Sequence, residues 1–246
     1  MHSRRVTDMG VAIVTGGSRG LGEALATGLA RAGWSVVIDG RDPVALSAAA
    51  KRIEPHFTSE GTLRMVPGDI TDPDHRMALV EAATELGGLD LVVNNAGVLG
   101  TSPLPPLAEY PLNDLRVALE VNVVSPLALI QTALPLLSAS VNPRIINITS
   151  DAGVEPYEGW GGYGAGKAAL DHVSAVLAVE RPDLRVWAVD PGDLRTQMHQ
   201  EAFPGEDISD RPEPESVVPL LVHLIDSTEP SGRYRAADFA VSGVSS

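Results

Sequence analysis

Short apolar runs rich in β-branched residues alternate with longer helical stretches along nearly the whole of this chain. This alternation is typical of α/β proteins in which helices cover both faces of a parallel sheet, and it predicts a doubly wound parallel sheet. Ligands of such folds bind outside the carboxyl ends of the strands. The expected strands are Ala12–Val14, Ser35–Asp39, Thr62–Pro67, Leu89–Asn94, Arg144–Thr149, Arg185–Val189 and Tyr234–Ala240, and the expected helices are Leu21–Ala32, Pro43–Glu54, Asp72–Leu86, Pro111–Leu137, Tyr163–Val179 and Pro214–Leu224.

Composition excludes several kinds of site. No Pro/Gly/Ser-rich linker divides the 246 residues, which favours one domain over 1–246. The chain has no cysteine, and no pair of its six histidines has HExxH spacing, so we expect neither a disulfide nor a catalytic metal. The net charge of −14 argues against nucleic acid as a partner. Because the chain contains no run of about eighteen apolar residues and no secretory h-region, we expect no membrane span and a cytoplasmic location.

A glycine-rich turn follows the first expected strand. It reads Thr15-Gly16-Gly17-Ser18-Arg19-Gly20-Leu21-Gly22 and opens a helical stretch rich in Ala and Leu. Glycines let the backbone approach a phosphate closely, and the positive end of a helix dipole favours an anion. Strand, turn and helix start together predict a phosphate cradle, although a glycine cluster alone is equally consistent with a tight turn.

Ser150, Tyr163 and Lys167 are the strongest candidates for chemistry. Tyr163 and Lys167 are four residues apart, so they lie on one face of a helix. A lysine ammonium beside a phenol favours the phenolate and lowers a pKa that starts at about 10. Such a phenol can exchange a proton with a substrate oxygen, and a serine hydroxyl can hydrogen-bond the same oxygen. Lys167 is also one of only two lysines in a chain with sixteen arginines, which suggests that arginine would not serve there.

Six motifs occur in a fixed order along the chain. They are the glycine turn TGGSRGLG, Asp69-Ile70, Asn94-Asn95-Ala96-Gly97, Asn122 within EVNVVSP, the strand end Ile146-Asn147-Ile148-Thr149-Ser150 with its step of thirteen to Tyr163, and Pro191-Gly192-Asp193-Leu194-Arg195-Thr196. Together they resemble the short-chain dehydrogenase/reductase family, in its single-domain branch, over most of the chain. The resemblance implies one Rossmann-type domain and an oxidoreductase that interconverts a ketone or aldehyde and an alcohol.

The resemblance also implies a role for each motif residue. Tyr163 is implied as the general acid in reduction and the general base in oxidation, and Ser150 as the group that orients the substrate oxygen. Lys167 is implied to lower the pKa of Tyr163 and to hold the nicotinamide ribose. Asn122 is implied to hold a water in the proton path, although a structural helix asparagine also fits. The implied cofactor-binding residues are Gly16, Ser18, Arg19, Gly20, Leu21, Gly22, Arg41, Asp69, Ile70, Asn95, Ala96, Gly97, Tyr163, Lys167, Pro191, Gly192, Leu194 and Thr196.

Two arginines bear on which dinucleotide is expected. Arg19 lies within the glycine turn, and Arg41 follows the second expected strand. A cation at this strand end suits the 2′-phosphate of NADP, whereas an acid there would hydrogen-bond the ribose of NAD. Aligned with the family, the acidic position falls on Gly40, which favours NADP(H). If the alignment shifts by one residue, Asp39 becomes the ribose ligand and the cofactor is NAD(H).

The resemblance extends to substrate binding and assembly. The charged segment 198–212 corresponds to the mobile substrate lid of the family, and a plain surface loop also fits it. The apolar stretches Leu115–Leu137 and Ala168–Val179 correspond to helices that pair across a two-fold axis, which implies a homodimer or homotetramer unless both are buried in the monomer. The C-terminal third, through Pro191–Met198 and Asp238-Phe239, is faintly similar to sepiapterin reductase and bacterial benzil reductases. That similarity hints at a vicinal dicarbonyl or aryl ketone substrate.

Two other classes of protein stay open. A dinucleotide-binding regulator without turnover keeps the glycine turn but usually loses the Tyr–Lys pair, so the intact Ser150, Tyr163 and Lys167 disfavour it. A sugar-nucleotide epimerase of the longer branch usually has a GxxGxxG turn and a substantial C-terminal lobe. The spacing of TGGSRGLG and the short C-terminal part disfavour that class.

Overall fold

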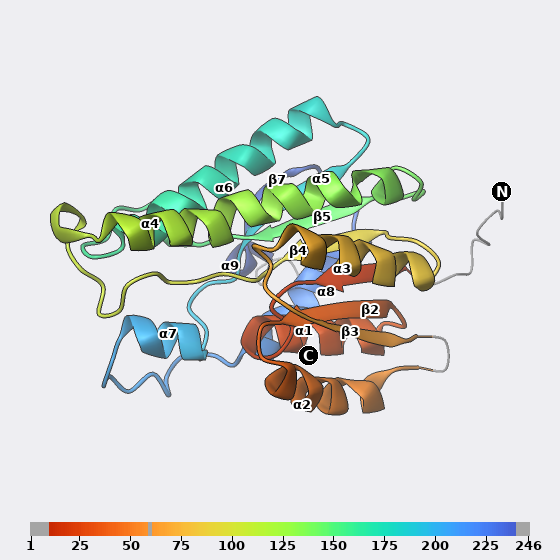
Figure 1. Cartoon of the computed structure of the whole chain (residues 1–246), viewed down its shortest axis with the longest axis horizontal. Coiled ribbons are helices and arrows are strands. Elements are labelled where there is room, and N and C mark those ends of the chain that lie inside the picture. The colour runs from red at the N-terminus through yellow and green to blue at the C-terminus, as the bar shows by residue number, and fades with distance from the viewer. Residues whose placement is uncertain (1–9, 59–60, 240–246) are drawn as a thin grey trace.

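The computed structural model describes residues 10–58 and 61–239, and in these residues seven parallel strands form one sheet (Figure 1). The strand order is β3-β2-β1-β4-β5-β6-β7, so the expected doubly wound α/β fold is confirmed. The strands are β1 Val11–Val14, β2 Ser35–Gly40, β3 Leu63–Pro67, β4 Leu91–Asn94, β5 Arg144–Ile148, β6 Arg185–Asp190 and β7 Gly232–Arg235. The helices are α1 Gly20–Arg31, α2 Pro43–Ile53, α3 Pro73–Glu85, α4 Leu112–Leu119, α5 Ser125–Leu137, α6 Gly161–Glu180, α7 Gln197–Ala202, α8 Val218–Asp226 and α9 Ala236–Phe239.

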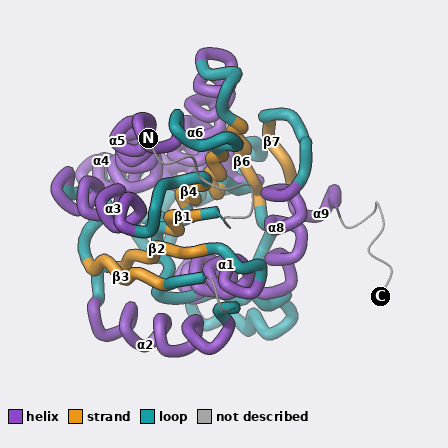
Figure 2. The backbone as a smooth tube through the Cα atoms, turned by 90° about the vertical axis from the view of Figure 1, so that its right-hand side faces the viewer, coloured by secondary structure: helices purple, strands orange, loops and turns teal. Residues whose placement is uncertain are grey.

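The sheet is the middle of three layers. Helices α1, α2 and α8 pack on one face, and α3, α5 and α6 pack on the other (Figure 2). Alternate side chains of a strand point to opposite faces, so Ala12 and Val14 of β1 join one apolar cluster while Val11 and Ile13 join the other. Because both faces are covered, the central strands read as continuous apolar runs in the sequence.

The strand order reverses direction at β1, which pairs with both β2 and β4. At such a point the loops that follow the two central strands diverge and leave a crevice at the carboxyl edge of the sheet. Here the loops after β1 and β4 are joined, because Asn95 Nδ2 donates to the Thr15 carbonyl at 2.8 Å and Thr15 Oγ1 accepts from the Asn95 amide at 3.0 Å. The glycine turn is thus fixed beside the segment that follows β4.

Two expected elements differ in the structure. The strand predicted at Tyr234–Ala240 is β7 at Gly232–Arg235, and the chain then turns into α9; Ala240 lies outside the described residues. Alanine favours helix over strand, and Ala236 is buried against the α8 side of the core. The helix predicted at Pro111–Leu137 contains a π-helical turn at Glu120–Val124, between α4 and α5. Such turns are frequent at functional sites, and this one carries Asn122.

The helical run Leu112–Leu137 is long and apolar enough by composition to cross a membrane, with a mean hydropathy of 1.6. Polar residues such as Asn122 and Gln131 interrupt its apolar run, which is why the sequence predicts no span. In the structure its inner face, including Leu129 and Ile130, is buried against the sheet as part of the core. The run is therefore accounted for as a core helix of this fold.

Candidate active site

The glycine turn leaves the start of α1 open to an anion. Among the described helices, α2, α3 and α7 are capped by the side chains of Asp42, Asp72 and Thr196, whereas α1 has no side-chain cap, as is also true of α4, α5, α6 and α8. The first amides of a helix need an acceptor, and a phosphate supplies one. Gly16 has φ +67°, and a Cβ at Gly22 would lie 2.3 Å from the Gly16 carbonyl oxygen. The turn therefore needs glycine at both positions and fits a dinucleotide phosphate.

Asp39, the alternative ribose ligand, is turned into the protein. Its Oδ1 accepts the Gly16 amide proton at 2.6 Å, and its Oδ2 lies 3.0 Å from Nε2 of His75 on α3. Its side chain is only 3% exposed. The carboxylate supports the glycine turn from within, and nothing in the motifs of the sequence indicated His75 as its partner.

Arg41 and Asp69 lie near each other, after β2 and β3. The Thr71 amide holds the pKa of the Asp69 carboxyl below its usual value, and the charge of Arg41 adds to this effect. Gly40 adjoins the glycine turn, because a Cβ there would lie 3.1 Å from Ser18 Oγ. Arg41 is exposed beside this contact. Ile70, the neighbour of Asp69, is buried.

Arg19 is bonded to α7 in this structure. Its Nη1 donates to Gln197 Oε1 at 2.6 Å, so its side chain reaches the first turn of α7. Thr196, immediately before α7, also adjoins the glycine turn, because a Cβ at Gly20 would lie 3.5 Å from Thr196 Cγ2. The loop after β6 and the glycine turn therefore lie next to each other at the carboxyl edge of the sheet.

The segment after β4 is held by Asn122. The Asn122 side-chain amide pairs with the main chain of Val98, accepting from its amide at 2.9 Å and donating to its carbonyl at 2.8 Å. A Cβ at Gly97 would lie 3.1 Å from Asn122 Oδ1 and 3.9 Å from Lys167 Nζ. Asn122 and Lys167 are thus both adjacent to Gly97. The remaining predicted cofactor residues, Ala96, Pro191, Gly192 and Leu194, follow β4 and β6 at the same edge of the sheet.

Ser150, Tyr163 and Lys167 come together as the sequence predicts. Ser150 follows β5, and the other two lie in the first turns of α6. Ser150 lies close enough to Tyr163 for its hydroxyl to lower the pKa of the phenol. Lys167 Nζ lies 5.4 Å from the centre of the Tyr163 ring and donates to the Ile148 carbonyl at 2.7 Å. Both side chains are buried, Tyr163 at 8% exposure and Lys167 at 4%.

The acid–base properties of this trio differ from the expectation. Burial raises the pKa of Tyr163 well above its usual value, the charges of Asp190 and Asp151 add to the rise, and the Ser150 hydroxyl only partly opposes it. The predicted lowering by Lys167 is not found here, because Lys167 loses its charge at about pH 8, below the range in which the phenol titrates. Burial lowers the pKa of Lys167 to about 8, against the opposing charge of Asp171.

An apolar cluster walls the space beside Tyr163. The ring of Trp160 meets that of Tyr163 edge-on, with centroids 5.7 Å apart, and Phe203 lies 5.9 Å from Trp160 on the other side. Ala202, from α7, is buried in the same cluster. The segment predicted as a lid at 198–212 therefore packs, through its first residues, into the apolar cluster that contains Tyr163. Figure 1 shows α7 standing apart from the sheet.

Asp151 is a site residue that the sequence did not single out. Its Oδ1 accepts from the Ser150 hydroxyl at 3.0 Å, and its Oδ2 accepts from the phenol of Tyr157 at 3.0 Å. The hydrogen bond to Asp151 raises the pKa of Tyr157. Asp151 directly follows Ser150 in the sequence, which could have indicated that it lies near the site. Its contacts with Ser150 and Tyr157 depend on the turn that follows β5.

Comparison with known proteins agrees with this geometry. The family model described as short chain dehydrogenase matches residues 10–207. A rhamnolipid-biosynthesis 3-oxoacyl-[acyl-carrier-protein] reductase from Pseudomonas aeruginosa is 38% identical over 196 residues, covering 76% of this chain and 74% of the relative.

Solved structures extend the similarity over nearly the whole chain. A short chain dehydrogenase from Shigella flexneri complexed with NADP has a TM-score of 0.85 and 28% identity, covering 95% of this chain and 100% of that one. One from Escherichia coli complexed with NADPH has a TM-score of 0.84 and 29% identity, covering 95% and 99%.

Proposed function

Because the chain belongs to the short chain dehydrogenase family, we propose that it is an NADP(H)-dependent oxidoreductase that interconverts a ketone or aldehyde and an alcohol. The observation that carries this proposal is the convergence of Ser150, Tyr163 and Lys167 beside an uncapped helix start at the carboxyl edge of the sheet. A dinucleotide-binding regulator would not need a buried proton donor and a buried ammonium at that place.

In the proposed reaction, the bound cofactor supplies or accepts the hydride at its nicotinamide ring. Ser150 and Tyr163 hydrogen-bond the substrate oxygen, and Tyr163 passes its proton to that oxygen as the carbonyl is reduced. Lys167 stabilises the phenolate that remains and binds the ribose of the cofactor. Asn122 holds the segment after β4 in place and orders a water toward Lys167.

The raised pKa of Tyr163 favours the reductive direction. A phenol whose pKa lies well above neutral is almost fully protonated at pH 7, which is the form that donates a proton to a carbonyl oxygen. The same shift makes the phenol a poor base for alcohol oxidation near neutral pH. The phenol is therefore in the form that carbonyl reduction at pH 7 requires.

Two arrangements support NADP(H) over NAD(H). Asp39 is occupied by Gly16 and His75, which leaves it unsuited to bind ribose hydroxyls. Arg41 is exposed next to the contact of Gly40 with Ser18, where it can meet a 2′-phosphate. Arg19 would join it after leaving Gln197. Two of the similar solved structures are complexes with NADP or NADPH.

The wall beside Tyr163 supports an apolar ketone as substrate. Trp160, Phe203 and Leu104 contribute to the cluster around the phenol, and none of them carries a charge. An aryl ketone or a vicinal dicarbonyl can place its apolar group against these side chains while its oxygen meets Ser150 and Tyr163.

A substrate screen tests the proposed function. Purified protein is mixed with NADPH or NADH and a panel of aryl ketones, vicinal dicarbonyls and aliphatic ketones, and nicotinamide absorbance is followed. We expect turnover with NADPH on at least one activated ketone, with the alcohol identified by chiral chromatography. Tight NADPH binding without turnover on the whole panel would instead support the regulator.

A further inference from the structure

Arg233, on β7, lies outside every motif of the sequence, yet its guanidinium joins the elements that carry the proposed catalytic groups. Its Nε lies 3.0 Å from Asp171 Oδ2 on α6. Its Nη2 donates to the main-chain oxygen of Ser150 at 3.0 Å and lies 3.5 Å from Asp190 Oδ2 at the end of β6. One side chain therefore ties α6, the end of β5 and the end of β6 together.

The two carboxylates that Arg233 meets are sheltered from water. The side chain of Asp171 is 15% exposed and that of Asp190 is 6% exposed. Sheltered carboxylates are unstable as anions unless a cation or hydrogen-bond donors compensate them. Burial raises the pKa of Asp190, and the charge of Arg233 works against that rise. Arginine suits this position because its planar fork can serve several acceptors at once.

Both carboxylates act on the proposed catalytic pair. Asp171 lies four residues after Lys167 on α6, and its charge raises the pKa of that ammonium against the effect of burial. Asp190 is one of the two charges that raise the pKa of Tyr163, Asp151 being the other. Any cation held on Asp171 and Asp190 therefore changes the field at the two groups that handle the proton.

We propose that Arg233 is a positioning residue that anchors the Ser150 main chain to α6 and β6 and balances the charge of Asp171 beside Lys167. The proposal rests on the proposed function for its catalytic meaning. Arg235 on β7 is another charge near Asp190, and its guanidinium is bonded to Asp238 on α9.

Lys167 offers a direct probe of this arrangement. The chain contains only two lysines, and the other, Lys51, is exposed on α2. The full chain grown with carbon-13-labelled lysine gives two NMR signals, and Lys51→Arg assigns them. In the cofactor-free protein, Lys167 should titrate at about pH 8. The measurement needs no turnover, so its outcome is separate from that of the substrate screen.

Three variants separate charge balance from a general loosening of the fold. Arg233→Met removes the cation and should raise the pKa of Lys167 by about one unit. Asp171→Asn, which keeps the shape of the side chain, should lower it. The double variant removes both charges and should return the pKa close to that of the wild type. If Arg233→Met merely let water reach Lys167, the pKa would rise and would stay raised in the double variant.

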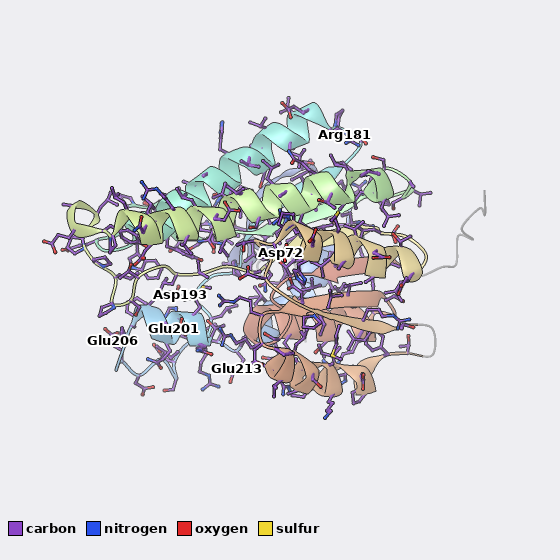
Figure 3. The ribbon with its side chains drawn as sticks, in the orientation of Figure 1. Asp72, Arg181, Asp193, Glu201, Glu206 and Glu213 are labelled. Atoms are coloured by element: carbon purple, nitrogen blue, oxygen red, sulfur yellow. The ribbon has the colours of Figure 1, made fainter. Side chains whose placement is uncertain are left out.

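Arg181→Met is the matched control. Its side chain is 29% exposed, compared with 28% for Arg233, and it also pairs with an aspartate. Figure 3 places it at the far end of α6, away from α7. The Arg181→Met variant should leave the Lys167 titration unchanged. The proposal is overturned if folded Arg233→Met titrates like the wild type, or if the double variant keeps the pKa of Arg233→Met.

Discussion

Burial and the charges of nearby aspartates set the acid–base properties of Tyr163 and Lys167. The pattern of Tyr163 and Lys167 predicts that they share a helix face, and the structure places them so. Their pKa values depend on Asp151, Asp171 and Asp190, which converge only in the folded chain. Sequence reasoning therefore identified the catalytic candidates but gave the wrong direction for the pKa of Tyr163.

The lowered pKa of Lys167 predicts a pH limit for the free enzyme. A buried ammonium with a pKa of about 8 is charged below that pH and neutral above it. Only the charged form can stabilise a phenolate, so kcat/KM for ketone reduction with NADPH should be level between pH 6 and 7 and fall above about pH 8. A pH–rate profile of kcat/KM checks this. A profile that stays level to pH 10 would contradict it.

Arg41 predicts the cofactor preference. A charge-assisted hydrogen bond to the 2′-phosphate is worth about 1.5–3 kcal/mol, so Arg41→Ala should raise the KM for NADPH by about ten- to a hundred-fold. The KM for NADH should barely change, because NADH lacks that phosphate. Arg31→Ala, at the opposite end of α1, is the control and should leave both constants unchanged. Equal damage to both cofactors in Arg41→Ala would refute the basic pocket.

At the scale of elements, the sequence predicts a strand, turn or helix well where neighbouring residues in the chain determine its conformation. The glycine turn and the start of α1 belong to this class. The π-helical turn around Asn122 does not, because it depends on the pairing of Asn122 with Val98 in a distant loop. The end of β7 was also missed, since Ala236 begins α9 and is buried against the core.

The glycine turn predicts a strict requirement at position 22. Gly22→Ala would put a Cβ 2.3 Å from the Gly16 carbonyl oxygen, so the turn must open or α1 must shift. We expect NADPH affinity to fall by tenfold or more, measured by calorimetric titration. Gly232→Ala is the matched control, because its Cβ would meet Tyr234 at an ordinary 3.5 Å. Equal NADPH affinity in both variants would show that the turn does not contact the phosphates.

At the scale of the whole molecule, several valines of the helical run 112–137 and of α6 are exposed. Val117, Val124 and Val179 are 58%, 49% and 82% exposed. Figures 1 and 2 show α6 running alongside α4 and α5. The sequence prediction of paired helices fits this surface, and we propose that two chains associate through it.

A charge on this surface should separate the two chains. Val179→Glu would place a carboxylate within the proposed contact, so light scattering at micromolar concentration should show a dimer or tetramer for the wild type and a monomer for the variant. Val141→Glu, at a position fully exposed in a loop, should behave as the wild type does. A monomeric wild type would contradict the prediction.

The central claim is that Tyr163 donates the proton during carbonyl reduction, and Tyr163→Phe tests it most directly. The variant keeps the ring and loses only the hydroxyl, so NADPH binding should persist while kcat on the best ketone of the screen falls by about 10²–10⁴. Tyr234 lies on β7, and its hydroxyl donates to the Pro230 carbonyl. Tyr234→Phe removes that hydroxyl and should retain the wild-type kcat. A Tyr163→Phe enzyme that keeps more than half of the wild-type kcat would contradict the account.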